Sequence, residues 1–171
     1  MTDVNAEIAR KSIRCFGTII IRLPNMSKNV AAHLRNFLTL QINYVTTEVM
    51  KVLKDVFRRY PDFVADFVPF ISKINLDQIE DIEGKTGFVW MLGQFCDQIE
   101  EAPYMIEKLI KDVSELNSPE FTVILLMSTF KMFFKRAPET KKVLSVLFKE
   151  IMTNSTDTDL KQKAVFMYRL L

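Results

Sequence analysis

The chain places a proline at an equivalent point in four successive segments. The prolines are Pro24, Pro61, Pro103 and Pro138, and each follows an apolar pattern with helical spacing. Proline cannot continue a helix, but it is well accepted in the first turn of the next one. We therefore predict four tight corners, each joining the two helices of a hairpin.

The predicted hairpins recur at a steady spacing. Their first helices are expected to begin near residues 5, 43, 82, 119 and 157, which gives about 38 residues per hairpin, near the lower limit of HEAT and armadillo repeats. The pattern predicts an all-α protein, a right-handed α-solenoid of HEAT/armadillo-like hairpins with about nine helices. The predicted repeats are 5–42, 43–81, 82–118 and 119–156, with a further first helix from 157.

Composition agrees with a helical protein that has a substantial core. Only 4 glycines and 6 prolines occur in 171 residues, while 49% of residues are hydrophobic. So few turn-forming residues argue against a β-sandwich or barrel, and so many apolar residues argue against disorder. Because Gly17, Gly84, Gly87 and Gly93 form no phosphate-binding pattern, a Rossmann or P-loop enzyme is also excluded.

Charge and targeting features indicate a cytoplasmic protein. The net charge of +2 is too small for a dedicated nucleic-acid binder. Two cysteines suggest a reducing compartment, and the N-terminal residues show no secretory signal. The apolar stretch 121–134 is too short to span a membrane.

Helical periodicity predicts which faces are buried. In 43–60 the apolar residues share one face, and Glu48 and Lys51 are assigned to the opposite, solvated face. The segment 119–137 is apolar nearly all round, which predicts a helix buried between neighbours. Asp157 or Asp159 is expected to cap the last helix, which ends on an apolar pair. Because solenoids end in polar caps, we expect 1–171 to be one segment of a longer trunk with association-prone ends.

Residues able to support catalysis are sparse. His33 is the only histidine and has no partner carboxylate at helical spacing, so we interpret it as a surface or packing residue. Cys15 and Cys96 fall in different repeats and are interpreted as small core residues. The sequence therefore predicts no catalytic, cofactor-binding or metal-binding residue, and no enzyme.

Several segments, in order, resemble one known family. The run NYVTTEVMKVLKDVFRRYPDF (43–63) is similar to the trunk of the β-adaptins, the large β subunits of heterotetrameric adaptor complexes. Further similar segments are ARKSIRCFGTIIIRL, GFVWMLGQFCDQIEEAPYMIE with a Trp90 expected to be buried, TFKMFFKRAPET and DTDLKQKAVFMYRLL. The corner IEEAPYMIE is closer to the β subunit of the fourth adaptor complex. The last of these segments, DTDLKQKAVFMYRLL, differs from the usual sequence of the family in its middle residues.

The resemblance implies a non-catalytic scaffold for vesicle coat assembly and cargo sorting in intracellular protein transport. Its partners would be a medium chain, a small chain and a second large chain. Its location would be the cytosolic face of trans-Golgi network, endosomal or coated-vesicle membranes, reached only through the complex. Other HEAT or armadillo scaffolds, such as a coatomer large subunit or a nuclear transport receptor, remain open alternatives.

A protein-binding surface is predicted on the second helices of the hairpins. These helices are expected at about 27–41, 62–74, 103–115 and 139–153, to be shorter than the first helices, and to line the concave face of the solenoid. Their mixed charge suits a folded protein partner, which the resemblance names as the N-terminal domain of an adaptor medium chain. The candidate binding residues are Lys108, Lys111, Asp62, Asp66, Lys141 and Lys142.

Overall fold

The computed structural model describes the backbone of residues 3–116 and 118–171, and the side chains of 5–110 and 118–171. Within these residues it contains nine α-helices, three short 3-10 helices and no β-strand. The protein is therefore all-α and built from HEAT/armadillo-like helical hairpins, as the sequence predicts. It divides into two compact units, Met1–Phe88 (unit 1) and Val89–Leu171 (unit 2).

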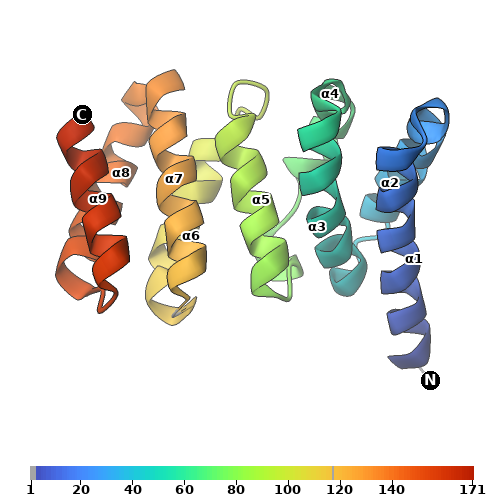
Figure 1. The fold of residues 1–171 in the computed structure, drawn as a ribbon, viewed down its shortest axis with the longest axis horizontal. Helices are drawn as coiled ribbons and strands as arrows, with labels where there is room; N and C mark the ends of the chain where they lie inside the picture. The colour runs from blue at the N-terminus through green and yellow to red at the C-terminus, as the bar shows by residue number, and fades with distance from the viewer. Residues whose placement is uncertain (1–2, 117) are drawn as a thin grey trace. The chain divides into compact units, whose positions relative to one another are not determined.

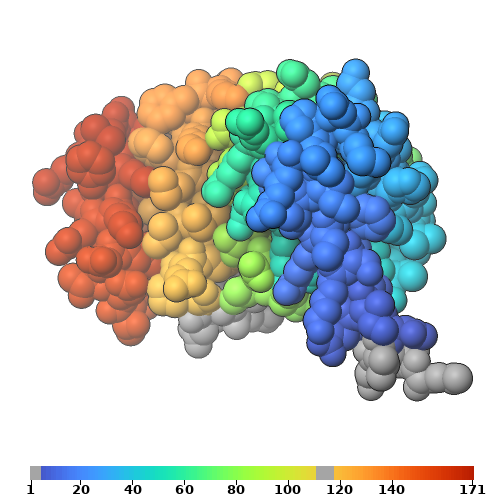
Figure 2. Space-filling model, turned by 45° about the vertical axis from the view of Figure 1, so that its right-hand side comes forward, coloured from blue at the N-terminus to red at the C-terminus, as the bar shows by residue number. Residues whose placement is uncertain are grey.

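Unit 1 holds two hairpins and the beginning of α5. Its elements are α1 (Asp3–Arg22), η1 (Pro24–Met26), α2 (Ser27–Thr39), α3 (Asn43–Arg59), η2 (Pro61–Phe63), α4 (Val64–Ile71), η3 (Leu76–Gln78) and the first half of α5 (Ile82–Gln94). The first helices α1 and α3 lie side by side, and the second helices α2 and α4 pack against each other (Figure 1). In the view of Figure 2 the residues of α1, drawn in dark blue, lie at the surface of this unit.

Unit 2 holds the second half of α5, α6 (Ala102–Leu116), α7 (Pro119–Lys135), α8 (Ala137–Asn154) and α9 (Thr158–Leu170). Here α7 packs against α6, α8 and α9, and α6 packs against α8 (Figure 1). The Asp157 side chain caps α9 by accepting hydrogen bonds from the backbone N–H groups of Asp159 and Leu160. The first helices begin at residues 3, 43, 82, 119 and 158, close to the predicted positions.

Proline starts the second half of each hairpin. Pro24 and Pro61 open the 3-10 turns that precede α2 and α4, and Pro103 and Pro138 stand in the first turns of α6 and α8. The predicted corners are confirmed. The second helices are shorter than the first only in unit 1, since α6 and α8 have 15 and 18 residues against 13 and 17 for α5 and α7.

The core of each unit is apolar and closely packed. In unit 1 the buried Phe57 and Phe67 rings meet edge to face at 5.4 Å. In unit 2 a similar core forms around Phe121, Leu125 and Leu147, which are at most 1% exposed. Burying each such side chain contributes about 1.5–3 kcal/mol, so these cores are the main source of stability.

Several side chains differ from their predicted burial. Phe134 of α7 is 66% exposed, so α7 is not buried on all sides, and Trp90 is only half-buried. Cys15 is exposed, whereas Cys96 is buried as predicted. His33 is exposed and stacks on Phe16, with ring centroids 6.0 Å apart, which agrees with its interpretation as a surface residue.

Candidate functional site

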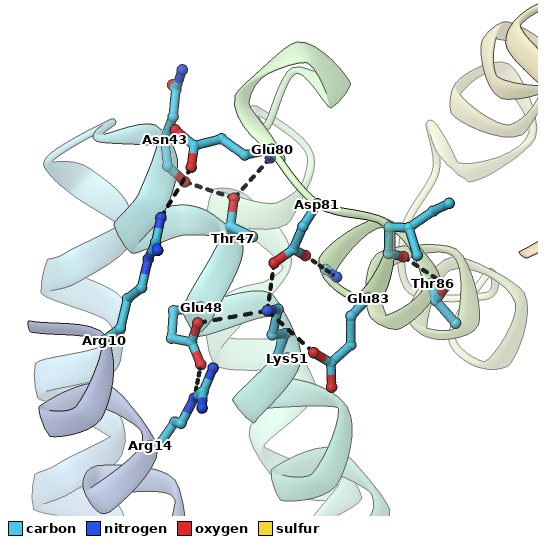
Figure 3. Close-up of polar contacts among 12 residues, drawn as sticks. Arg10, Arg14, Asn43, Thr47, Glu48, Lys51, Glu80, Asp81, Glu83 and Thr86 are labelled. Carbon is cyan, nitrogen blue, oxygen red and sulfur yellow. Dashed lines mark hydrogen bonds and ion pairs between the residues drawn. The ribbon is translucent and has the colours of Figure 1, made fainter. Parts of the chain in front are cut away.

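A network of ion pairs connects three segments of unit 1 around Lys51 of α3 (Figure 3). Lys51 Nζ lies 2.5 Å from Asp81 Oδ2, 3.2 Å from Glu83 Oε2 and 3.7 Å from Glu48 Oε2. Glu48 also accepts a hydrogen bond from Arg14 Nε of α1. Lys51 thus ties α3 to the start of α5, while Glu48 ties α3 to α1.

Both central residues of this network are less exposed than predicted. The side chains of Glu48 and Lys51 are 2% and 13% exposed, whereas periodicity assigned them to a solvated face. Burial of a charged group is tolerated only where opposite charges and hydrogen bonds satisfy it. Those partners come from α1 and from 81–83, so the pattern within α3 alone could not reveal them.

The segment that leads into α5 is fixed by further hydrogen bonds. Thr47 Oγ1 donates to the Asn43 carbonyl at 2.8 Å and accepts from the Glu80 backbone N–H at 2.9 Å. Glu80 also pairs with Arg10 of α1 at 3.3 Å. The Gly84 N–H donates to Asp81 Oδ1 at 2.8 Å. These contacts position Asp81 beside Lys51.

The charges in the network keep each other ionised. Burial opposes ionisation of Asp81, but the Lys51 ammonium and the Gly84 N–H outweigh it and lower the pKa of this carboxyl. Burial likewise opposes the charge of Lys51, but the Asp81 and Glu83 carboxylates outweigh it and raise the pKa of this lysine. Every charged group in the network has a partner of opposite charge. The network therefore serves to hold the helices together.

A second polar cluster holds the corner between α5 and α6 in unit 2. Arg136, between α7 and α8, donates through Nη1 to the carbonyl oxygens of Cys96, Ile99 and Glu100 at 3.1, 3.2 and 2.9 Å. Its other nitrogens pair with Glu139. Burial, helped by the adjacent Asp97 carboxylate, raises the pKa of the Cys96 thiol, which disfavours the reactive thiolate.

The described residues offer no metal site. No group of three or more His, Cys, Asp or Glu side chains converges among them. Across the same part of the chain, no helix is both long enough and apolar enough to cross a bilayer.

The predicted binding residues divide between the two units. Asp62 and Asp66 lie exposed in unit 1, where Asp66 Oδ2 pairs with Arg35 Nη1 of α2 at 3.6 Å. Lys108, Lys141 and Lys142 lie exposed on α6 and α8 of unit 2. Lys111 lies in 111–117, whose side chains are outside the described residues. The acidic candidates thus belong to unit 1, and the described lysine candidates belong to unit 2.

The exposed side of α8 combines lysines with an apolar groove. Lys141, Ser145, Lys149 and Thr153 follow each other at four-residue intervals along one edge of a groove of about 670 Å³. Apolar side chains from α7, α8, α9 and the residue after α9 line the rest of it: Phe133, Leu144, Phe148, Met152, Tyr168 and Leu171. Lys149 was not among the predicted binding residues, although its spacing of eight from Lys141 places the two on one helix face.

Comparison with known proteins gives the family of this helical array. The adaptin N-terminal region matches residues 1–171, the whole chain. The chain belongs to the adaptin family. This adaptin chain is 34% identical over 169 residues to Beta-adaptin-like protein A of Arabidopsis thaliana, covering 99% of the chain and 20% of that relative.

Other relatives of the adaptin chain are also β subunits by name. AP-1 complex subunit beta-1 of Mus musculus is 25% identical over 170 residues, covering 99% of the chain and 18% of the relative. AP-2 complex subunit beta of Schizosaccharomyces pombe is 26% identical over 110 residues, covering 64% of the chain and 16% of the relative. The adaptin chain thus spans at most about a fifth of the length of these curated relatives.

Proposed function

We propose that the chain forms part of the trunk of a β-type large subunit of a heterotetrameric adaptor complex. There it acts as a non-catalytic scaffold in vesicle coat assembly and cargo sorting. The match of the whole chain to the adaptin N-terminal region is the observation that carries this proposal. The names of the relatives, all β-adaptins or β subunits, favour the β type.

The partners in this proposal are a medium chain, a small chain and a second large chain. No cofactor or nucleic acid takes part, and membrane association is peripheral and occurs only through the complex. The location is the cytosolic face of trans-Golgi network, endosomal or coated-vesicle membranes. The corner sequence IEEAPYMIE (99–107) favours the fourth adaptor complex over the others.

Co-purification tests the scaffold proposal. The tagged chain is expressed in cells of its own organism, and its partners are identified by mass spectrometry. We expect recovery of a medium, a small and a second large adaptor chain, and the identity of the medium chain names the complex. Recovery of coatomer subunits or of transport receptors, with no adaptor chain, would contradict the proposal.

The second-helix surface is the proposed binding site for the N-terminal domain of the medium chain. Reversing the charge at Lys108 and Lys111 together should weaken this binding, because charge complementarity sets register and association rate. Lys51 cannot serve as a control since it holds the network in unit 1. Reversing the charge at Lys161 and Lys163 on α9 changes the net charge by the same amount and serves as the control. Equal effects of both pairs would contradict this site.

A further inference from the structure

One exposed hydroxyl group of unit 2 stands in an acidic sequence. Thr156 is followed directly by Asp157 and, at the third position after it, by Asp159. No other serine or threonine in the chain has an acid at the third position after it. Protein kinases select substrates partly by the pattern of charges around the target residue. Kinases of the acidophilic class, such as casein kinase II, prefer an acid at that position, so the sequence singles out Thr156 as their target.

Thr156 lies in the connection between α8 and α9, outside both helices. Residues 155–157 are not helical, and Thr156 is exposed. Its hydroxyl group makes no hydrogen bond within the part of the chain that the structure describes. The neighbouring Ser155 Oγ, by contrast, accepts a hydrogen bond from the Asp157 N–H at 3.1 Å. The Thr156 hydroxyl is therefore accessible and not engaged in holding the connection.

The residues on both sides of Thr156 can open without unpacking the core. A kinase binds the residues around its target in an extended conformation, so the adjoining helix ends must fray. None of residues 153–159 is buried, and the nearest buried side chains are Ile151 and Leu160. Opening this segment costs hydrogen bonds at two helix ends, among them the Asp157 cap of α9. Helix ends are among the least stable parts of a fold, so this opening is readily reached.

An open hollow beside Thr156 leaves room for a phosphate group. Its volume is about 350 Å³, and it lies between the beginnings of α7 and α9 and the end of α8. Its charged lining groups are the Glu150 and Asp157 carboxylates, and no lysine, arginine or histidine lines it. A phosphate there would meet like charges and no cation. It would therefore stay at the surface, where basic side chains of a partner can bind it.

We propose that Thr156 is phosphorylated by an acidophilic protein kinase. In this reaction Thr156 Oγ1 forms a bond to the γ-phosphorus of ATP, while the bond from that phosphorus to the oxygen shared with the β-phosphate breaks. The hydroxyl proton passes to the catalytic aspartate of the kinase, and ADP leaves. The product carries about two negative charges at neutral pH, beside a helix end that is already acidic. Phosphorylation of Thr156 does not depend on the proposed scaffold function.

Incubation of the chain with casein kinase II and ATP tests this modification. We expect tandem mass spectrometry to locate a phosphoryl group on Thr156, and we expect Thr156→Ala to remain unmodified. Thr158→Ala removes the neighbouring hydroxyl and should be phosphorylated at a rate within about twofold of the wild-type rate. Phosphorylation only at other residues, or at none, would overturn the proposal.

Two neutral variants test the role of the acidic pattern. Asp159→Asn preserves the shape of the side chain and leaves the Asp157 cap of α9 in place. It should lower the rate of phosphorylation about tenfold or more. Glu101→Gln neutralises an exposed acid before α6 and should change the rate by less than about twofold. Equal rates for the two variants would overturn the proposal.

The folded chain must itself be the substrate. Circular dichroism should show that the phosphorylated chain keeps its helices, because Thr156 belongs to none of them. Phosphorylation of the heat-unfolded chain alone would overturn the proposal. The chain isolated from cells of its own organism with phosphatase inhibitors should carry phosphate on Thr156, and its absence would also overturn the proposal. Neither measurement involves adaptor subunits, so their recovery in co-purification tests the proposed function separately.

Discussion

At the scale of single residues, charge pairing between helices has the most specific consequences. Lys51 meets three carboxylates that come from its own helix and from the start of α5. Glu48 is almost fully buried and depends on Arg14 and Lys51 to compensate its charge. Removing one member of such a network leaves the other charges incompletely satisfied.

Replacing Lys51 with methionine should destabilise unit 1. We expect a loss of about 2 kcal/mol in the free energy of unfolding, less than for a fully buried pair because the Asp81 and Glu83 side chains are 47% and 67% exposed. Chemical denaturation followed by circular dichroism measures it. Lys54→Met, one turn further along α3 and without an ion pair among the described contacts, is the control and should change stability by less than about 0.5 kcal/mol.

The contribution of Lys51 should depend on pH in a defined way. The pKa of Asp81 is lowered, so its stabilisation is present above the ordinary value of 3.8 and is lost as acid protonates it below that value. The pKa of Lys51 is raised, so its stabilisation is present below 10.5 and is lost as the lysine deprotonates above that value. The difference between wild type and Lys51→Met should therefore be constant at neutral pH and shrink at both extremes. A difference that persists at pH 2 would contradict this account.

Gln41 offers a stabilising substitution. It lies between α2 and α3 with φ of 53°, in the left-handed region that disfavours residues with a Cβ. Gln41→Gly should raise the free energy of unfolding by about 0.5–1 kcal/mol, because relief of backbone strain exceeds the added entropy of the unfolded chain. Thr39→Gly, in the last turn of α2, should instead destabilise. A loss of stability in both variants would argue against strain at Gln41.

At the scale of elements, α5 is distinguished by its glycines. It contains three of the four glycines of the chain within 13 residues. In unit 1 a Cβ on Gly87 would lie 3.1 Å from the Met50 carbonyl oxygen of α3. In unit 2 a Cβ on Gly93 would lie 2.6 Å from Ser128 Cα of α7. The helix thus approaches the backbone of a neighbour in each unit.

Alanine substitutions at Gly87 and Gly93 should differ in their effect on the free energy of unfolding. Gly93→Ala should cost about 1–3 kcal/mol, because the backbone of α7 must move to admit a methyl group. Gly87→Ala should be close to neutral, since its tighter contact is offset by the better helix propensity of alanine, about 1 kcal/mol. Thermal unfolding of both variants compares them. If Gly93→Ala left the thermal stability unchanged, α7 would be able to move at no energetic cost.

Sequence periodicity predicted the elements better than the contacts between them. The proline corners and helix starts followed from local rules, because caps and breaks depend on a few adjacent residues. Asp62, Lys108 and Lys141 are exposed, as residues of the predicted binding surface need to be. The burial of Glu48 and the pairing of Asp66 with Arg35 could not follow, since each depends on a partner in another helix.

At the scale of the whole molecule, exposed apolar side chains should govern its behaviour in solution. On α9, Phe166, Tyr168 and Leu170 are 64%, 62% and 57% exposed. Large exposed apolar side chains of this kind promote association between molecules. The association of this end of the chain stays a prediction, and the exposed side chains of α9 are the ones to test.

Light scattering over a concentration series tests the association. We expect the apparent mass to rise with protein concentration and the rise to be reduced in Phe166→Glu. The neighbouring Gln162→Glu adds the same charge at an exposed position of α9 and should leave association unchanged. Association that persists unaltered in Phe166→Glu would exclude this face of α9 as its cause.

The single tryptophan makes intrinsic fluorescence a local probe in this chain. Trp90 stands in α5, and its ring meets Phe95 edge to face at 6.0 Å. Its emission wavelength therefore reports the surroundings of α5, while the ellipticity at 222 nm averages over all the helices. If the hairpins lose structure at different temperatures, the two spectroscopic melting curves will separate. Their coincidence would show that α5 unfolds together with the rest of the chain.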